Sequence, residues 1–138
     1  MATWSQPSSS PSARPHAPTV LIVDDEPAIA DVVCAVLEES DIPADACPVG
    51  WQAQRCIREQ QPKVVILDVR MPTVDGISLF YSLRNDPRTH DIPVIFLTAN
   101  AQKVQMELPN YVDMGAILVP KPFDLDTLLD GVSRALAL

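Results

Sequence analysis

The most informative stretch of the sequence runs from Thr19 to Leu37 and reads TVLIVDDEPAIADVVCAVL. Its first five residues form a continuous apolar run, typical of a strand that is buried on both faces of a parallel sheet. Three acidic residues follow, and Pro27 then suits the first turn of a helix. Apolar residues recur after it at helical spacing, at Ile29, Val32, Val33, Val36 and Leu37. The stretch therefore predicts a buried strand, an acidic turn and an amphipathic helix.

The same alternation continues along the chain. We expect further strands over residues 44–47, 63–68, 93–98 and 116–120, and further helices over 51–60, 77–83, 99–108 and 125–136. Five strands that alternate with five helices through short loops indicate an α/β fold, with a parallel sheet covered by helices on both faces. Pro109 should end the fourth helix, and Pro120 suits an edge strand.

Composition sets the organisation of the chain and excludes several classes of partner. The 138 residues are 47% hydrophobic and 20% charged, as in an ordinary globular domain. Residues 1–18 hold five Ser and four Pro, so we expect a disordered tail over 1–18 and one folded domain over 19–138. The net charge of −8 argues against a nucleic-acid partner, and no apolar run approaches the roughly 18 residues of a membrane span.

The chain has three cysteines, without a CxxC motif, and two histidines, which disfavours a zinc site. Unpaired cysteines at helix or strand positions fit a reducing compartment, so we expect a cytoplasmic location.

Polar side chains follow the predicted strands at the points where the strands end. Asp24 and Asp25 follow the first strand, Asp68 ends the third, Thr98 ends the fourth and Lys121 follows the fifth. Ligands of such sheets bind beyond the carboxyl ends of the strands. Three carboxylates in one pocket repel one another unless a proton or cation binds, and hard oxygen ligands suit Mg²⁺. With a lysine and a hydroxyl nearby, this set fits phosphoryl transfer to an aspartate nucleophile.

Four segments at these strand ends resemble the receiver domain of two-component response regulators. They are VDDEP (23–27), ILDVRMP (66–72) with Asp75-Gly76, FLTAN (96–100) and KPF (121–123). The segments occur in the order of the family, and the resemblance covers residues 19–138. It implies a flavodoxin-like, doubly wound five-stranded sheet with strand order 2-1-3-4-5, in a single-domain regulator similar to the chemotaxis regulators.

The resemblance also implies a role for each matching residue. Asp68 is the implied phospho-acceptor, with Thr98 as the switch hydroxyl and Lys121 as the conserved cation. The implied Mg²⁺ ligands are the carboxylates of Asp24, Asp25 and Asp68 and the backbone carbonyl of Arg70. A cis Lys121–Pro122 bond is implied as well. Leu118 stands where the family often has an aromatic switch residue.

The implied function is phosphorelay signal transduction. The domain would accept a phosphoryl group from a histidine kinase or a histidine phosphotransfer protein on Asp68, with Mg²⁺, and would then change its contacts with a downstream protein target. We expect an autocatalytic phospho-acceptor rather than a multiple-turnover enzyme, with no nucleic-acid or membrane partner and with room for a homodimer.

Two alternatives stay open at this point. The first is a pseudo-receiver that serves as an interaction module without phosphorylation. Loss of an acid, of the acceptor or of the lysine would favour it, and all are present. The second is a haloacid-dehalogenase-like Mg²⁺ phosphohydrolase with an aspartyl nucleophile. That class resembles a pattern with a second acid two residues after the nucleophile, where this chain has Arg70.

The first helix carries small residues beside its apolar stripe. In similar proteins this helix docks on the helical bundle that presents the phosphorylated histidine. We therefore expect Ala30 and Cys34, one turn apart, to lie on the open face and to form part of a kinase-docking surface.

Overall fold

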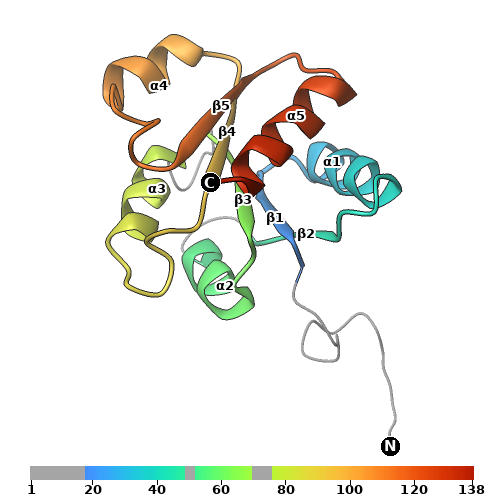
Figure 1. The fold of residues 1–138 in the computed structure, drawn as a ribbon, viewed down its shortest axis with the longest axis horizontal. Coiled ribbons are helices and arrows are strands. Elements are labelled where there is room, and N and C mark those ends of the chain that lie inside the picture. Colours follow the sequence, from blue (N-terminus) through green and yellow to red (C-terminus); the bar gives the residue numbers. More distant parts are fainter. Residues whose placement is uncertain (1–17, 49–51, 70–75) are drawn as a thin grey trace, which may run out of the picture.

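A computed structural model describes residues 18–48, 52–69 and 76–138 of the chain. Its centre is a five-stranded sheet in the order β2-β1-β3-β4-β5, in which every neighbouring pair is parallel (Figure 1). The strands are β1 (Val20–Val23), β2 (Ala44–Ala46), β3 (Val64–Asp68), β4 (Val94–Thr98) and β5 (Ala116–Pro120). The helices are α1 (Pro27–Glu39), α2 (Gln52–Gln60), α3 (Gly76–Arg84), α4 (Ala101–Glu107) and α5 (Leu125–Leu136). The expected fold class and strand order are confirmed.

Part of what the sequence predicts falls outside the described residues. This applies to residues 1–17 of the expected tail, to Trp51 at the start of the second helix, and to Arg70 with the turn over 71–75. The expected division into a tail and a domain, and the expected metal ligand at Arg70, therefore stay predictions.

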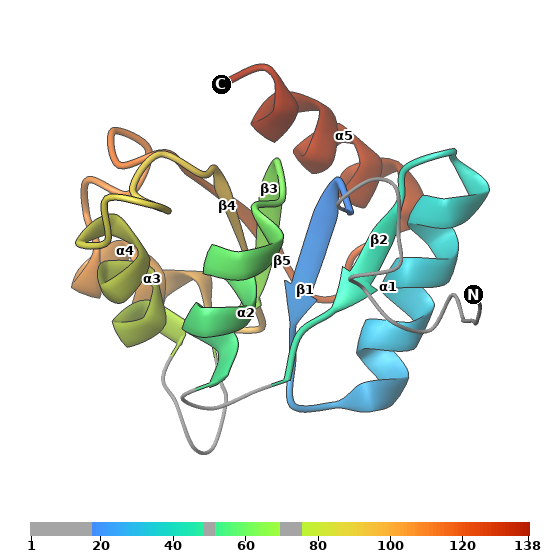
Figure 2. The same cartoon turned by 90° about the horizontal axis from the view of Figure 1, so that it is seen from below.

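Helices lie on both faces of the sheet (Figure 2), and side chains that alternate along the strands form a separate core on each face. Leu21, Val65 and Phe96 point to one face, where they pack against α2, α3 and α4. Ile22, Ile66 and Ile95 point to the other face, where they pack against α1 and α5. Because both faces are covered, all residues of β1, β3 and β4 are buried, which explains their continuous apolar sequences.

Helix α1 presents a different face to the sheet than its apolar stripe suggests. Val32, expected in the core, is 60% exposed, whereas Ala30 is 4% exposed and packs with Val33 and Leu37. Cys34 is half-buried against the same core. The expectation that Ala30 lies on an open docking face is therefore wrong. Residues 28–37 are apolar at almost every position, so their spacing left the inward face undetermined.

Helix α4 is shorter at both ends than the expected span of 99–108. The Asn100 side chain accepts a hydrogen bond from the Lys103 amide at 3.2 Å, which caps the start of the helix. The helix ends at Glu107, because Leu108 precedes Pro109 and the α conformation is disfavoured before a proline.

The two edge strands, β2 and β5, differ in how they present their outer amides. On β2, the Ala44 amide donates to the Glu38 carboxylate at 3.0 Å and the Ala46 amide donates to Asp45 at 2.9 Å. Strand β5 ends at Pro120, which has no amide hydrogen and lies at the edge of the sheet as expected. The Lys121–Pro122 bond that follows is cis, which confirms the expectation.

The described helices are all too short or too polar to cross a membrane.

Candidate functional site

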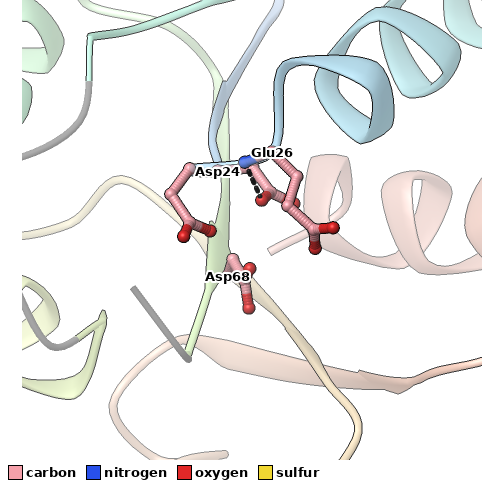
Figure 3. Close-up of side chains that lie close together, drawn as sticks. Asp24, Glu26 and Asp68 are labelled. Atoms are coloured by element: carbon pink, nitrogen blue, oxygen red, sulfur yellow. Dashed lines mark hydrogen bonds between the residues drawn. The ribbon is translucent and has the colours of Figure 1, made fainter. Parts of the chain in front are cut away.

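Four carboxylates meet at the carboxyl ends of β1 and β3. Asp24, Asp25 and Glu26 occupy the turn from β1 into α1, and Asp68 is the last residue of β3. One oxygen atom from each of the four lies within 4.8 Å of the others. Figure 3 shows Asp24 and Glu26 approaching Asp68 from the neighbouring strand end. The parallel pairing of β1 with β3 brings these acids together, as predicted for Asp24, Asp25 and Asp68.

Burial of Asp24 shifts the pKa of its carboxyl group. Asp24 is 7% exposed, and its Oδ1 accepts a hydrogen bond from the Glu26 amide at 2.9 Å (Figure 3). Its Oδ2 is buried and accepts no hydrogen bond from any residue that the structure describes. Burial raises the pKa of Asp24 to about 6, the Asp68 carboxylate adds to the rise, and the Glu26 amide and Lys121 oppose it. Ionised Asp24 is therefore costly unless a cation balances it.

Lys121 approaches the cluster from the end of β5. Its Nζ lies 3.6 Å from Oδ2 of Asp68, and the two side chains are 23% and 4% exposed. One ammonium group beside four carboxylates leaves an excess of negative charge. The site therefore favours a further cation, because Lys121 balances only part of the negative charge.

A cleft of about 350 Å³ opens above the cluster. Its lining residues are Asp25, Glu26, Asp68, Ala99 and Lys121. This volume is of the size that small-molecule sites have in proteins, roughly 300–1,000 Å³. A phosphoryl group that enters the cleft meets the Asp68 carboxylate and the Lys121 ammonium directly.

Thr98 stands next to the cleft rather than in its lining. It is 1% exposed, and its Oγ1 accepts a hydrogen bond from the Asn100 amide at 2.9 Å. Accepting this bond leaves the hydroxyl proton of Thr98 free for donation. Of the predicted residues, the structure thus brings together Asp24, Asp25, Asp68 and Lys121, keeps Thr98 buried beside them, and leaves Arg70 undescribed.

The donor set fits Mg²⁺. Carboxylate oxygens are the ligands that Mg²⁺ prefers, and the described cluster contains four acids and no His or Cys. The buried Oδ2 of Asp24 has no hydrogen-bond partner among the described residues, so this oxygen is available to bind a metal ion. Glu26 belongs to this cluster as well, although the sequence reasoning assigned it no role. Its place directly after two acids was the signal that could have included it.

Gly76 is a further positioning residue, of which the sequence shows only a turn signal. A Cβ atom at this position would lie 2.5 Å from the backbone oxygen of Asp68 and 2.9 Å from the Cα of Val69. The Gly76 amide also donates to the Val69 oxygen at 3.3 Å. Only glycine thus allows the start of α3 to pack against the backbone of the predicted acceptor.

We expect Gly76→Ala to lower the stability of the domain. The added methyl group meets backbone atoms, so the strand end or α3 has to move, at a cost of about 1–3 kcal/mol. At roughly 3–5 °C per kcal/mol for a domain of this size, this corresponds to a fall in melting temperature of about 3–15 °C, measurable by calorimetry.

Gly131→Ala in α5 is the matched control for Gly76→Ala. The Cβ of this variant would meet the Val119 side chain at 3.0 Å rather than any backbone atom, and alanine favours the helix. Its melting temperature should change less than that of Gly76→Ala. An equal or larger loss at Gly131 would contradict the role assigned to Gly76.

Comparison with known proteins decides the family. Residues 20–133 match the family model described as the response regulator receiver domain. The chain belongs to this family. The receiver domain therefore carries its acidic cluster in a fold used for two-component signal transduction.

Relatives of known sequence and solved structures agree with this assignment. The chain is 38% identical over 119 residues to the DNA-binding dual master transcriptional regulator RpaA of Synechocystis sp., a match over 86% of the chain and 48% of the relative. It is also similar to the receiver domain of the sensor histidine kinase PA1611 of Pseudomonas aeruginosa, whose structure has a magnesium ion coordinated in the active-site cleft. That match has a TM-score of 0.76 and 28% identity, over 88% of this chain and 99% of the other.

The chemotaxis response regulator CheY4 of Vibrio cholerae matches as well. Its TM-score is 0.73 at 26% identity, over 85% of this chain and 97% of the other. The chain spans about half the length of the curated relatives that it matches.

Proposed function

We propose that the receiver domain accepts a phosphoryl group on Asp68, with Mg²⁺ bound by the acidic cluster, and passes a phosphorelay signal to a protein target. The observation that carries the proposal is the Asp68 carboxylate in a cleft between Lys121 and three further acids. The phosphoryl donor is proposed to be a histidine kinase or a histidine phosphotransfer protein, in line with the family.

In the proposed reaction an Asp68 oxygen attacks the phosphorus of the donor. The bond from phosphorus to the histidine nitrogen breaks, and an acyl phosphate forms on Asp68. The Lys121 ammonium, 3.6 Å from Asp68, stabilises the negative charge of the transferring oxygens.

Asp24, Asp25 and Asp68 would hold Mg²⁺, with the Arg70 carbonyl as a proposed further ligand. A bound Mg²⁺ would supply charge neutralisation for the phosphoryl oxygens. The buried Oδ2 of Asp24 supports this assignment, because a bound cation would stabilise a carboxylate whose ionised form is otherwise unfavourable.

Thr98 is the proposed sensor of the phosphoryl group. Its hydroxyl proton is available, and Oγ1 is tied to the Asn100 amide at the start of α4. A new hydrogen bond from Thr98 to a phosphoryl oxygen would alter this link and therefore the position of α4. Movement of α4 would change the surface offered to a partner.

The proposed partners are proteins. The net charge of −8 disfavours nucleic acid as a partner of this domain, although RpaA is named as DNA-binding. Each molecule is proposed to take one phosphoryl group rather than to turn over substrate as an enzyme.

Mass spectrometry after incubation with acetyl phosphate and Mg²⁺ tests the proposed function. We expect one labile adduct of about 80 Da, formed only with a divalent cation present. Absence of an adduct would instead support a pseudo-receiver, and multiple turnover of phosphate esters would support a phosphohydrolase.

A further inference from the structure

Glu26 is the exposed acid of the cleft. It is the N-cap residue of α1, a position where Ser, Thr, Asp or Asn usually accepts a hydrogen bond from the first turn of the helix. The Glu26 side chain makes no such bond to α1. One of its oxygen atoms instead lies within 4.8 Å of oxygen atoms of the other three acids in the cluster (Figure 3). It also lines the cleft, together with Asp68 and Lys121. The side chain therefore contributes to the cleft and not to the cap of the helix.

Main-chain hydrogen bonds fix the position of Glu26. Its amide donates to Oδ1 of Asp24 at 2.9 Å, and its carbonyl oxygen accepts from the Ile29 and Ala30 amides at 3.0 and 3.1 Å. These bonds anchor the residue between β1 and α1 without the help of its side chain. A change of Glu26 to Gln therefore keeps the anchoring bonds and removes one negative charge from the cleft.

The charges of the loaded cleft leave one carboxylate in excess. The acidic cluster has four carboxylates, whereas Lys121 and one Mg²⁺ together would bring three positive charges. Asp24 and Asp68 are almost fully buried, and the Lys121 ammonium lies 3.6 Å from Asp68. Glu26 is exposed and is not among the proposed metal ligands. The Glu26 carboxylate is therefore the charge that an ion meets as it enters the cleft from solvent.

We propose that Glu26 sets the charge selectivity of the cleft: its carboxylate strengthens the binding of a divalent cation and slows phosphoryl uptake from small anionic donors. This inference rests on the proposed function. The carboxylate attracts a dication bound by the cluster and repels a phosphoryl dianion that approaches Asp68. Because the cleft is open to water, both effects are moderate, and salt weakens both. Loss of the Glu26 charge should therefore move Mg²⁺ affinity and phosphoryl uptake in opposite directions, which a defect in folding would not do.

Glu26→Gln tests this inference, because it replaces the charge by an amide of similar size. Isothermal titration calorimetry with magnesium chloride should give a Kd about 3- to 10-fold higher than that of the wild type at about 0.1 M salt. Labelling by acetyl phosphate at saturating Mg²⁺, followed by intact-mass spectrometry, should be about 3- to 10-fold faster. With phosphoramidate, which carries less negative charge than acetyl phosphate, the gain in rate should be smaller. At about 1 M salt the changes in Kd and in rate should fall below about twofold.

Glu39→Gln is the matched control for Glu26→Gln. Glu39 is exposed at the other end of α1, roughly 20 Å from Glu26 along the helix, so the variant changes the net charge equally and leaves the cleft intact. It should match the wild type in both measurements.

Labelling of Glu26→Gln at or below the wild-type rate, an unchanged Mg²⁺ affinity, or a gain that persists at about 1 M salt would each overturn the inference. Equal labelling of all three proteins would contradict only the role of Glu26. An absence of label in all three would overturn the proposed function and this inference with it.

Discussion

Asp68→Asn should abolish phosphoryl uptake from acetyl phosphate. The change removes the nucleophilic oxygen but keeps the size of the side chain, so labelling should fall to background, a loss of more than about 100-fold. Asp68 is 3% exposed beside Lys121 in the cleft, and this position makes it the expected acceptor among the described acids. Intact-mass spectrometry of the acyl phosphate, with Mg²⁺ present, measures the effect.

Asp31→Asn is the control for this variant, because Asp31 is exposed on α1 and outside the acidic cluster. It should label like the wild type. Uptake by Asp68→Asn at the wild-type rate would show that another residue is the acceptor. Circular dichroism of both variants verifies that the fold is retained.

Asp24→Asn should make the metal-free domain more stable at neutral pH. The folded state raises the pKa of Asp24 from 3.8 to about 6, so it binds the proton more tightly than the unfolded state does. Ionisation of Asp24 therefore lowers the free energy of unfolding. This loss is absent below about pH 3.8, grows as the pH rises, and is complete above about pH 6. At one pKa unit per roughly 1.4 kcal/mol, it amounts to the order of 3 kcal/mol. The amide of Asn removes the charge and still accepts the bond from Glu26.

Urea denaturation without metal measures this gain, which should shrink as the pH falls from about 7.5 to about 4. Asp25→Asn is the matched control, because Asp25 is only half-buried and should show a smaller gain. A loss of stability in metal-free Asp24→Asn at neutral pH, or a gain that is the same at every pH, would contradict this account.

Magnesium should reduce the stability advantage of Asp24→Asn over the wild type. A ligand that binds only the folded state stabilises it by about 2.7 kcal/mol at 100 times its Kd. The wild type should therefore gain stability with Mg²⁺, and the variant, which lacks one proposed ligand, should gain less. An equal gain in both proteins would remove Asp24 from the proposed set of metal ligands.

Much of the fold could be predicted because its determinants are local. Continuous apolar runs such as Val64–Leu67 and Val94–Leu97 are required of strands that are covered on both faces. Residues at the carboxyl ends of such strands lie at one edge of a parallel sheet. With the strand order that the family resemblance implies, this geometry predicted that Asp24, Asp25, Asp68 and Lys121 lie together.

Features that depend on close packing could not be predicted. Helix α1 is apolar on most sides, so only the packed structure shows that Ala30 faces inward and Val32 faces outward. A Cβ atom at position 76 would lie 2.5 Å from the backbone oxygen of Asp68, and this close approach is known only once the positions of α3 and β3 are known.

The edges of the sheet also affect the behaviour of the domain at high concentration. Main-chain donors on an open edge are templates on which a second molecule can add a strand and start aggregation. On β2 the carboxylates of Glu38 and Asp45 already occupy the outer amides, and on β5 Pro120 offers no amide hydrogen. On β5 the Ala116 amide is taken as well, by the Tyr111 oxygen. Intermolecular β-pairing is thus discouraged at these positions of both edge strands.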